Sequence, residues 1–168
     1  MPDRSAAPTA PPCPLWRRLL ALVYDLLIVV AIVMVVGLLS QLATGGQLVQ
    51  GADHTQVPAW YRPLQGLVVS AYFIGSWLRG GQTVGMRPWH IRVTARDGAG
   101  PTLQQAVLRL LVAAAPMLLL MLAPALGLRA TLWLLLAAWG AWLAVALFDP
   151  RRRALHDIVA GTELRQIR

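Results

Sequence analysis

The sequence contains one cysteine, Cys13, no lysine, and few charged residues for its length. With a single cysteine, the chain can form neither an internal disulfide framework nor a cysteine-built metal site. Only 13% of the 168 residues are charged, against roughly a quarter in soluble proteins, while 57% are hydrophobic. A soluble domain of this size cannot bury so many apolar side chains, because its surface is too large for its volume. The composition therefore argues against a cytosolic globular enzyme and predicts that lipid is the main solvent of the chain.

Four apolar runs predict an all-α fold, an integral membrane bundle of four transmembrane helices. A helix rises about 1.5 Å per residue, so about 20 apolar residues cross the hydrocarbon core of a bilayer. The second run is the weakest of the four, because it reaches only the lower limit of that length. The predicted spans are residues 19–40, 62–78, 106–126 and 130–148.

The distribution of arginine predicts the topology. Of the 15 basic residues, all arginine, twelve fall on one side of a four-span arrangement and only Arg62 and Arg129 on the other, while Arg109 lies near the start of the third span. Because basic residues gather on the cytoplasmic side, both termini are predicted to lie in the cytoplasm. Without the second span the arginines would be divided across the membrane, which is why that span is retained.

The net charge of +8 fits the anionic inner leaflet of a bilayer, so no nucleic-acid partner is needed to explain it. The exclusive use of arginine indicates a GC-rich bacterial genome, and the four apolar runs predict a multi-pass membrane protein. The residues expected at the membrane surface are Arg17, Arg151, Arg152 and Arg153.

Proline and glycine delimit a membrane domain over residues 16–164. The proline-rich residues 1–15 predict a disordered cytoplasmic tail, and residues 165–168 form a second tail. Between the second and third spans, the cytoplasmic loop 79–101 begins with a glycine run that is read as a tight turn. Within that loop, residues 90–94 alternate enough to predict a short strand.

Two helix starts are predicted from capping residues. Thr102 lies three residues before Gln105, the spacing of a capping box, so the third helix should begin there. Asp149 is followed by Pro150, which predicts a short helix over residues 150–160 that ends at Gly161. This terminal helix should lie along the membrane surface with its polar residues toward water.

Asp25 is the charge that costs most in the predicted bundle. It lies about two turns into the first span, where a carboxylate costs roughly 2.5–3.5 kcal/mol, so it must be paired, protonated or in contact with water. Arg18 shares its helical face but lies about 10 Å away along the axis, and Arg109, at similar depth in the third span, is the better candidate partner. Asp25 is then a structural ion pair that determines helix order, a proton or cation site, or a lipid-exposed charge.

The histidines and the remaining acids predict no catalytic or metal centre. His54, His90 and His156 are spread over different segments, and each is expected on the solvated surface. Asp157 is expected there too, or else it neutralises nearby arginines, including Arg18. Since no nucleophile–base pair or ligand cluster is present, we expect neither an enzyme nor a bound cofactor.

Three stretches of the chain carry a family resemblance: RRLLALVYDLL, GGQTVGMRPWHIRVTARDG and FDPRRRALHDIVAGT. In this order and spacing they resemble the RDD family of small bacterial membrane proteins, named for one arginine and two aspartates. The resemblance implies that these are Arg18, Asp25 and Asp157. The family usually has a proline and a lysine where this chain has Val84 and Met86. It implies a polytopic inner-membrane protein, with transport often suggested and cation antiport proposed for some members.

Two functions are compatible with these features. The first is cation or proton transport by an oligomer, with Asp25 as the exchanging carboxylate paired with Arg18 or Arg109. The second is a non-catalytic scaffold or assembly partner, in which the charges determine helix packing and the loop 79–101 with the terminal helix forms a docking surface. Both predict an anionic bilayer and a second copy of the chain or another membrane protein as partners.

Overall fold

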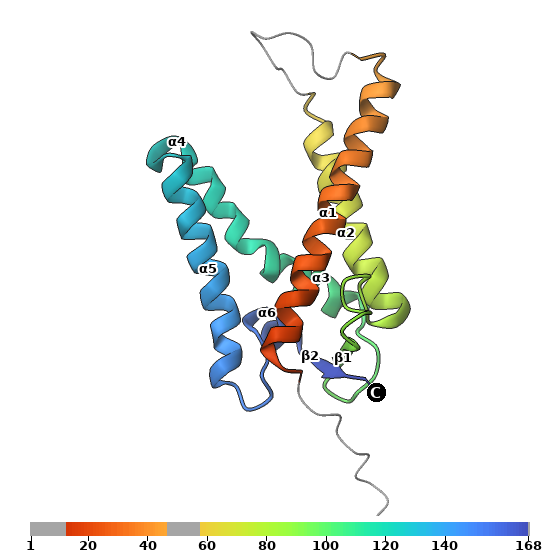
Figure 1. The fold of residues 1–168 in the computed structure, drawn as a ribbon, viewed down its shortest axis with the longest axis vertical. Helices are drawn as coiled ribbons and strands as arrows, with labels where there is room; N and C mark the ends of the chain where they lie inside the picture. Colours follow the sequence, from red (N-terminus) through yellow and green to blue (C-terminus); the bar gives the residue numbers. More distant parts are fainter. Residues whose placement is uncertain (1–12, 47–57, 168) are drawn as a thin grey trace, which may run out of the picture.

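The computed structural model describes residues 13–46 and 58–167 and is mostly helical (Figure 1). Its elements, in chain order, are α1 (Leu15–Ala43), α2 (Tyr61–Gly80), β1 (Ile91–Ala95), α3 (Leu103–Ala114), the 3₁₀ helix η1 (Ala115–Leu122), α4 (Ala123–Leu126), α5 (Leu128–Phe148), α6 (Leu155–Ala160) and β2 (Thr162–Gln166).

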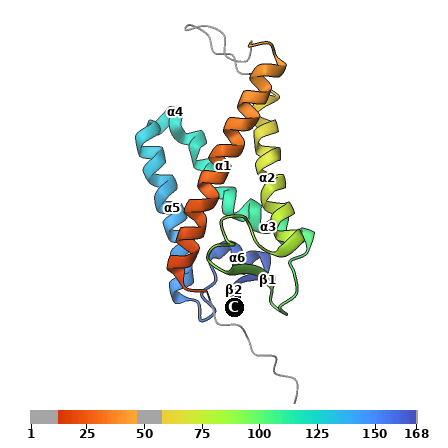
Figure 2. The ribbon, with the colours of Figure 1, turned by 45° about the vertical axis from the view of Figure 1, so that its right-hand side comes forward.

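The helices form two antiparallel pairs that stand on a common layer. α1 runs beside α2, and the stretch from α3 to α4 runs beside α5, while α6, β1 and β2 lie together at one end (Figure 1). Figure 2 shows the same layer from a second direction. Most described arginines belong to segments at this end, which we call the arginine-rich layer, whereas Arg62 and Arg129 lie at the starts of α2 and α5, at the opposite end.

Three helical stretches are long and apolar enough to cross a membrane: Leu15–Ala43, Leu103–Leu126 and Leu128–Phe148. They correspond to the first, third and fourth predicted spans. α2 occupies the place of the second predicted span beside α1, but it is not one of the three and carries Arg62, Gln65 and Arg79. The second predicted span, and with it the total of four, stays a prediction, as does the cytoplasmic position of the termini.

The third apolar stretch changes its helix type at the first of its two prolines. The α-helix ends at Ala114, and the 3₁₀ helix η1 follows with Pro116 near its start. Proline has no N–H to donate, so carbonyl groups of the preceding turn need other partners. The indole Nε1 of Trp139 in α5 donates to the carbonyl oxygen of Ala113 at 3.1 Å. The neighbouring helix thus satisfies the interrupted backbone, as expected for a proline in a membrane helix.

The buried core lies in the arginine-rich layer. Trp77, Met86, Ile91, Val93 and Leu164 pack there at the junction of α2, the following loop and the two strands. In contrast, the middle of α1 exposes large apolar side chains all along its length, as a helix surrounded by lipid does. The layer is therefore the part of the protein that folds around its own core.

The predicted strand and helix start in the layer are confirmed. β1 pairs antiparallel with β2, with Val93 opposite Leu164, so the strand predicted at residues 90–94 is correct to within one residue. Thr102 and Gln105 form the expected capping box. β2 was not predicted, and residues 165–166, assigned to a tail, belong to it. The tail assigned to residues 1–15 lies mostly outside the described residues, and α1 already begins at Leu15.

The predicted terminal helix over residues 150–160 is wrong in its first half and in its polar face. Asp149 accepts hydrogen bonds from the backbone N–H groups of Arg151 and Arg153, at 3.1 and 2.9 Å, and so closes a turn instead of capping a helix. α6 begins only at Leu155, packs against α3, and buries Asp157 completely. Its most polar side chain therefore faces protein, not water.

Gly85 allows the loop after α2 to touch the backbone of α1. A Cβ atom at Gly85 would lie 2.7 Å from the carbonyl oxygen of Ala21 and from the backbone nitrogen of Asp25. We expect Gly85→Ala to destabilise the protein by about 1–3 kcal/mol, because neither helix nor loop can yield without losing contacts. The measurement is the midpoint of thermal unfolding in detergent. Gly100→Ala is the control, since a Cβ there meets nothing within 4 Å. Equal midpoints for the two variants would contradict the close approach.

Candidate functional site

One face of α1 is buried in the arginine-rich layer and carries two charges. Arg18, Ala21 and Asp25 are 3%, 2% and 3% exposed, and their spacing places them on the same side of the helix. α1 has 29 residues, hence a length of about 43 Å, which exceeds the roughly 30 Å of a hydrocarbon core. Its first turns can therefore lie in the polar layer while the remainder spans the apolar distance.

Asp25 is surrounded by hydrogen-bond donors from α2 and the loop that follows it. Its Oδ1 accepts from the hydroxyl of Tyr72 at 2.9 Å and from the backbone N–H of Gly85 at 3.0 Å, and its Oδ2 accepts from the Thr83 hydroxyl at 2.6 Å. The Tyr72 oxygen in turn accepts from the N–H of Val84 at 3.1 Å. We call Asp25, the hydroxyls of Tyr72 and Thr83 and the backbone N–H groups of Val84 and Gly85 the Asp25 cluster.

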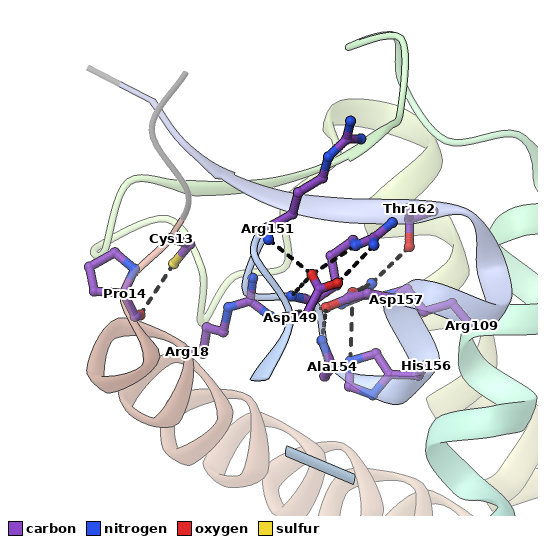
Figure 3. A network of polar contacts seen from close by, with 11 residues as sticks. Cys13, Pro14, Arg18, Arg109, Asp149, Arg151, Ala154, His156, Asp157 and Thr162 are labelled. Carbon is purple, nitrogen blue, oxygen red and sulfur yellow. Dashed lines mark hydrogen bonds and ion pairs between the residues drawn. The ribbon is translucent and has the colours of Figure 1, made fainter. Parts of the chain in front are cut away.

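Asp157 is the centre of a second, arginine-containing cluster (Figure 3). Arg18 Nη1 donates to its Oδ2 at 3.0 Å, and Arg109 Nη1 from α3 donates to its Oδ1. The backbone N–H of Ala154 adds a bond to Oδ2 at 3.0 Å, and Arg109 also donates to the Thr162 hydroxyl at 3.0 Å. This Asp157 cluster joins α1, α3, α6 and β2 through side chains that are almost fully buried.

Trp77 supports the same cluster from α2. The guanidinium carbon of Arg109 lies 5.2 Å from the centre of the Trp77 ring, within the range of a cation–π contact. Arg109 is therefore held by a carboxylate, a hydroxyl and an aromatic face from three different elements.

The predicted pairing of Asp25 with Arg18 or Arg109 is wrong. Both arginines bind Asp157, and no arginine in residues 13–46 and 58–167 forms an ion pair with Asp25. The alternative expectation for Asp157, that it neutralises Arg18, is confirmed. Arg18 and Asp157 are close because α6 packs on α3 beside the start of α1, an arrangement that helical spacing within α1 does not reveal.

His156 also departs from its predicted surface position. Its ring lies against the Asp157 cluster, with Nε2 3.8 Å from Asp157 Oδ1. Burial and the positive charge of Arg109 lower the pKa of His156 to about 4, so the imidazole is neutral at physiological pH. His90 is exposed as expected, and His54 lies outside the described residues.

The two clusters differ in the charged groups that they contain. Burial would raise the pKa of Asp157, but the charges of Arg109, His156 and Arg18 and the Ala154 N–H lower that pKa to about 2. The carboxylate is therefore ionised, and with two guanidinium groups around it the Asp157 cluster has a net charge of about +1. The Asp25 cluster contains a carboxylate and no cationic side chain, so it is negative whenever that group is ionised.

The four residues expected at the membrane surface fall into two kinds. Arg17 donates to the carbonyl oxygen of Trp89 at 3.2 Å, and Arg153 pairs with Asp149 at 2.8 Å. Arg151 and Arg152 are exposed. No group of three His, Cys, Asp or Glu side chains that could hold a metal ion occurs in the part of the chain that the structure describes.

Sequence reasoning missed Tyr72, Thr83, Gly85 and Thr162 as parts of these clusters. Each is an uncharged residue, and its role depends on which charged group lies opposite it in space. The second motif stretch contains Thr83 and Gly85, but its glycine run predicts only a tight turn.

Apolar helices standing on a layer of buried arginine and aspartate side chains define a small helical membrane protein with a polar base. The RDD family profile matches residues 12–161, and the chain belongs to the RDD family. Comparison with curated proteins and with solved structures gave no match. The expected family is thus confirmed. In the structure, Asp25 and Asp157 lie at the centres of the two clusters, and Arg18 pairs with Asp157.

Asp157→Asn should unfold the protein more readily than any exposed acidic substitution. It leaves two buried guanidinium groups without a counter-charge, which costs about 3–5 kcal/mol. The unfolding midpoint in detergent measures the effect, with Asp97→Asn in the exposed turn after β1 as the control. If both variants unfold at the same temperature, Asp157 does not hold the layer together.

The stability of the layer should fall in mild acid because of His156. Its pKa is about 4 in the folded protein and about 6.5 in an unfolded chain, so below pH 6.5 the unfolded state binds the proton first. The free energy of unfolding should drop by up to about 3 kcal/mol between pH 6.5 and 4. Asp157 adds a further loss below about pH 4, as its pKa is also lowered.

Unfolding midpoints of the parent and of His156→Gln, recorded from pH 7.5 to 4.5, check this origin. The variant should show a much shallower dependence on pH. A parallel loss in both proteins would assign the acid sensitivity to other groups.

Proposed function

We propose that this protein exchanges protons and monovalent cations at Asp25, as a non-catalytic, multi-pass inner-membrane protein that transports cations in exchange for protons. The observation that carries the proposal is the Asp25 cluster: a carboxylate only 3% exposed, to which no arginine of the described residues is bound. An ion pair with arginine would hold the carboxylate permanently charged and occupied. Without one, a proton or a small cation can supply the missing positive charge.

The chemistry of the neighbouring groups fits such a ligand. Thr83 and Tyr72 place hydroxyl oxygens 2.6 and 2.9 Å from the two carboxylate oxygens. Hydroxyl and carboxylate oxygens are the ligands that hard cations prefer, and a hydroxyl can rotate its proton away to accept a cation. Because a proton and a cation would occupy the same carboxylate, they would compete, which is the requirement for exchange.

Access to Asp25 would be controlled by the loop after α2. Thr83, Val84 and Gly85 cover the carboxylate and its Tyr72 partner, and they are held there by the hydrogen bonds of the cluster itself. Protonation removes acceptor capacity from the carboxylate and so weakens the bonds that keep the loop closed. The Asp157 cluster, on the same face of α1, keeps the helix in place while the loop opens.

An oligomer is part of the proposal. The three apolar stretches expose large apolar side chains over much of their length, so they do not enclose a conduction path by themselves. A second copy or another membrane protein packed on these surfaces would provide the second wall.

A membrane scaffold is the second candidate, and the Asp157 cluster favours it. That cluster uses Arg18 and Asp157, which the resemblance assigns to the arginine and one aspartate of the family name, to join four elements of one layer. In a scaffold, the charged residues would serve only to build this layer, and the layer would present the loop 79–101 to a partner.

Flux measurements on purified protein in liposomes distinguish the two candidates. With an imposed Na⁺, K⁺ or Li⁺ gradient, the parent should drive proton movement, reported by a pH-sensitive dye inside the vesicles. Asp25→Asn should abolish that flux, and Asp25→Glu should retain part of it, because only the carboxylate can exchange the ions. Asp97→Asn is the control and should behave as the parent.

The unfolding midpoint of each variant establishes that the protein is folded. Absence of flux in the parent with all three cations, or undiminished flux in Asp25→Asn, would reject transport at Asp25 and favour the scaffold.

A further inference from the structure

The turn between α5 and α6 is built around the carboxylate of Asp149. This group accepts hydrogen bonds from the backbone N–H groups of Arg151 and Arg153, and from Nε and Nη2 of the Arg153 side chain at 2.9 and 2.8 Å. The bonds with Arg153 lower the pKa of Asp149 far below its usual range, so its charge neutralises that of Arg153. Asp149 thus neutralises Arg153, one of three consecutive arginines, and its hydrogen bonds order the backbone that carries Arg151 and Arg152.

Arg151 and Arg152 remain exposed on this ordered turn. The Arg151 side chain is 60% exposed, and its nearest carboxylate, that of Glu163, lies 4.0 Å away and also pairs with Arg165. Arg152 has a φ of +52°, in the left-handed region that arginine rarely adopts. Arg152 thus adopts a strained conformation that a glycine would fit better, and both arginine side chains are exposed.

The turn directly follows an apolar helix that is long enough to span a membrane. Leu147 and Phe148, the last residues of α5, are 66% and 87% exposed. Large exposed apolar side chains next to exposed guanidinium groups match the boundary between acyl chains and phosphates in a bilayer. At this depth the chemical group available to the arginines is the lipid phosphate.

We infer that the turn of residues 148–153 is a binding site for the phosphate of an anionic phospholipid. Phe148 enters the acyl region, and Arg151 and Arg152 donate to the phosphate oxygens, for which the planar guanidinium is well suited. Asp149 neutralises only Arg153, so the negative headgroup supplies the counter-charge for Arg151 and Arg152. This site is independent of the proposed exchange at Asp25, since it uses none of the same residues.

Lipid binding by the full chain in detergent tests the inference. Phosphatidylglycerol and phosphatidylcholine are titrated separately, and retention of each lipid is followed by native mass spectrometry. The parent should prefer phosphatidylglycerol. In the double variant Arg151→Gln/Arg152→Gln that preference should fall about 10- to 30-fold, because each arginine near an anionic surface contributes roughly fivefold.

Arg129→Gln is the matched control. Arg129 is an exposed arginine next to the exposed Leu128, at the opposite end of the same helix, so it has the same chemistry without the Asp149 turn. It should keep the preference of the parent. An unchanged preference in the double variant, or an equal loss in Arg129→Gln, would overturn the site. If millimolar inorganic phosphate raises the unfolding midpoint of the parent as much as phosphatidylglycerol does, the site binds free phosphate, and the assignment of a lipid is overturned.

Arg152→Gly separates binding from folding. Glycine accepts the left-handed conformation, so the lipid-free variant should unfold at a slightly higher temperature than the parent. Its preference for phosphatidylglycerol should nevertheless fall about fivefold. A stabilised variant that binds the lipid as well as the parent would show that Arg152 takes no part in the site.

Discussion

Burial of charge on one face of α1 is the constraint on which the rest of the structure depends. A guanidinium and a carboxylate that are both 97% covered must each find partners, because an uncompensated buried charge costs several kcal/mol. The two groups lie about 10 Å apart along α1, too far to pair with each other, so their partners come from elsewhere in the chain. Arg18 pairs with Asp157 of α6, and Asp25 accepts hydrogen bonds from α2 and the loop that follows it. The contacts of these two side chains thus join α1 to the polar layer.

Hydropathy and local signals predicted the elements of this fold well, but the partners of its charges poorly. The apolar runs, the capping box at Thr102 and the strand near Val93 depend on neighbours within a few residues, and each was recognised in the sequence. The partner of Arg109 depends on how α6 folds back onto α3 after α5. The sequence predicts similar depths for Asp25 and Arg109, yet Asp157, 48 residues beyond Arg109, takes the bond. Depth along a helix limits which groups can meet, whereas the packing of the layer decides which ones do.

The same distinction explains the error over the terminal helix. Asp149 followed by Pro150 has the composition of a helix start, but Arg153 competes for the carboxylate with its backbone and side-chain donors. The competing donor, Arg153, is the last of three consecutive arginines, and a pattern of capping residues alone takes no account of such a donor. His156 was likewise misplaced, since a histidine next to an aspartate looks solvated until a second helix covers both.

The two helix pairs meet mainly at the layer and diverge beyond it in both views of the molecule (Figures 1 and 2). From Asp25 to the end of α1 there are about 27 Å of helix, so a tilt of about 5° at the base moves the far tip by roughly 2 Å. A small change of tilt where Gly85 contacts α1 is thus enlarged at the far end of the helix. The breaking of one hydroxyl contact near Asp25 would therefore produce a larger displacement at the far end of α1.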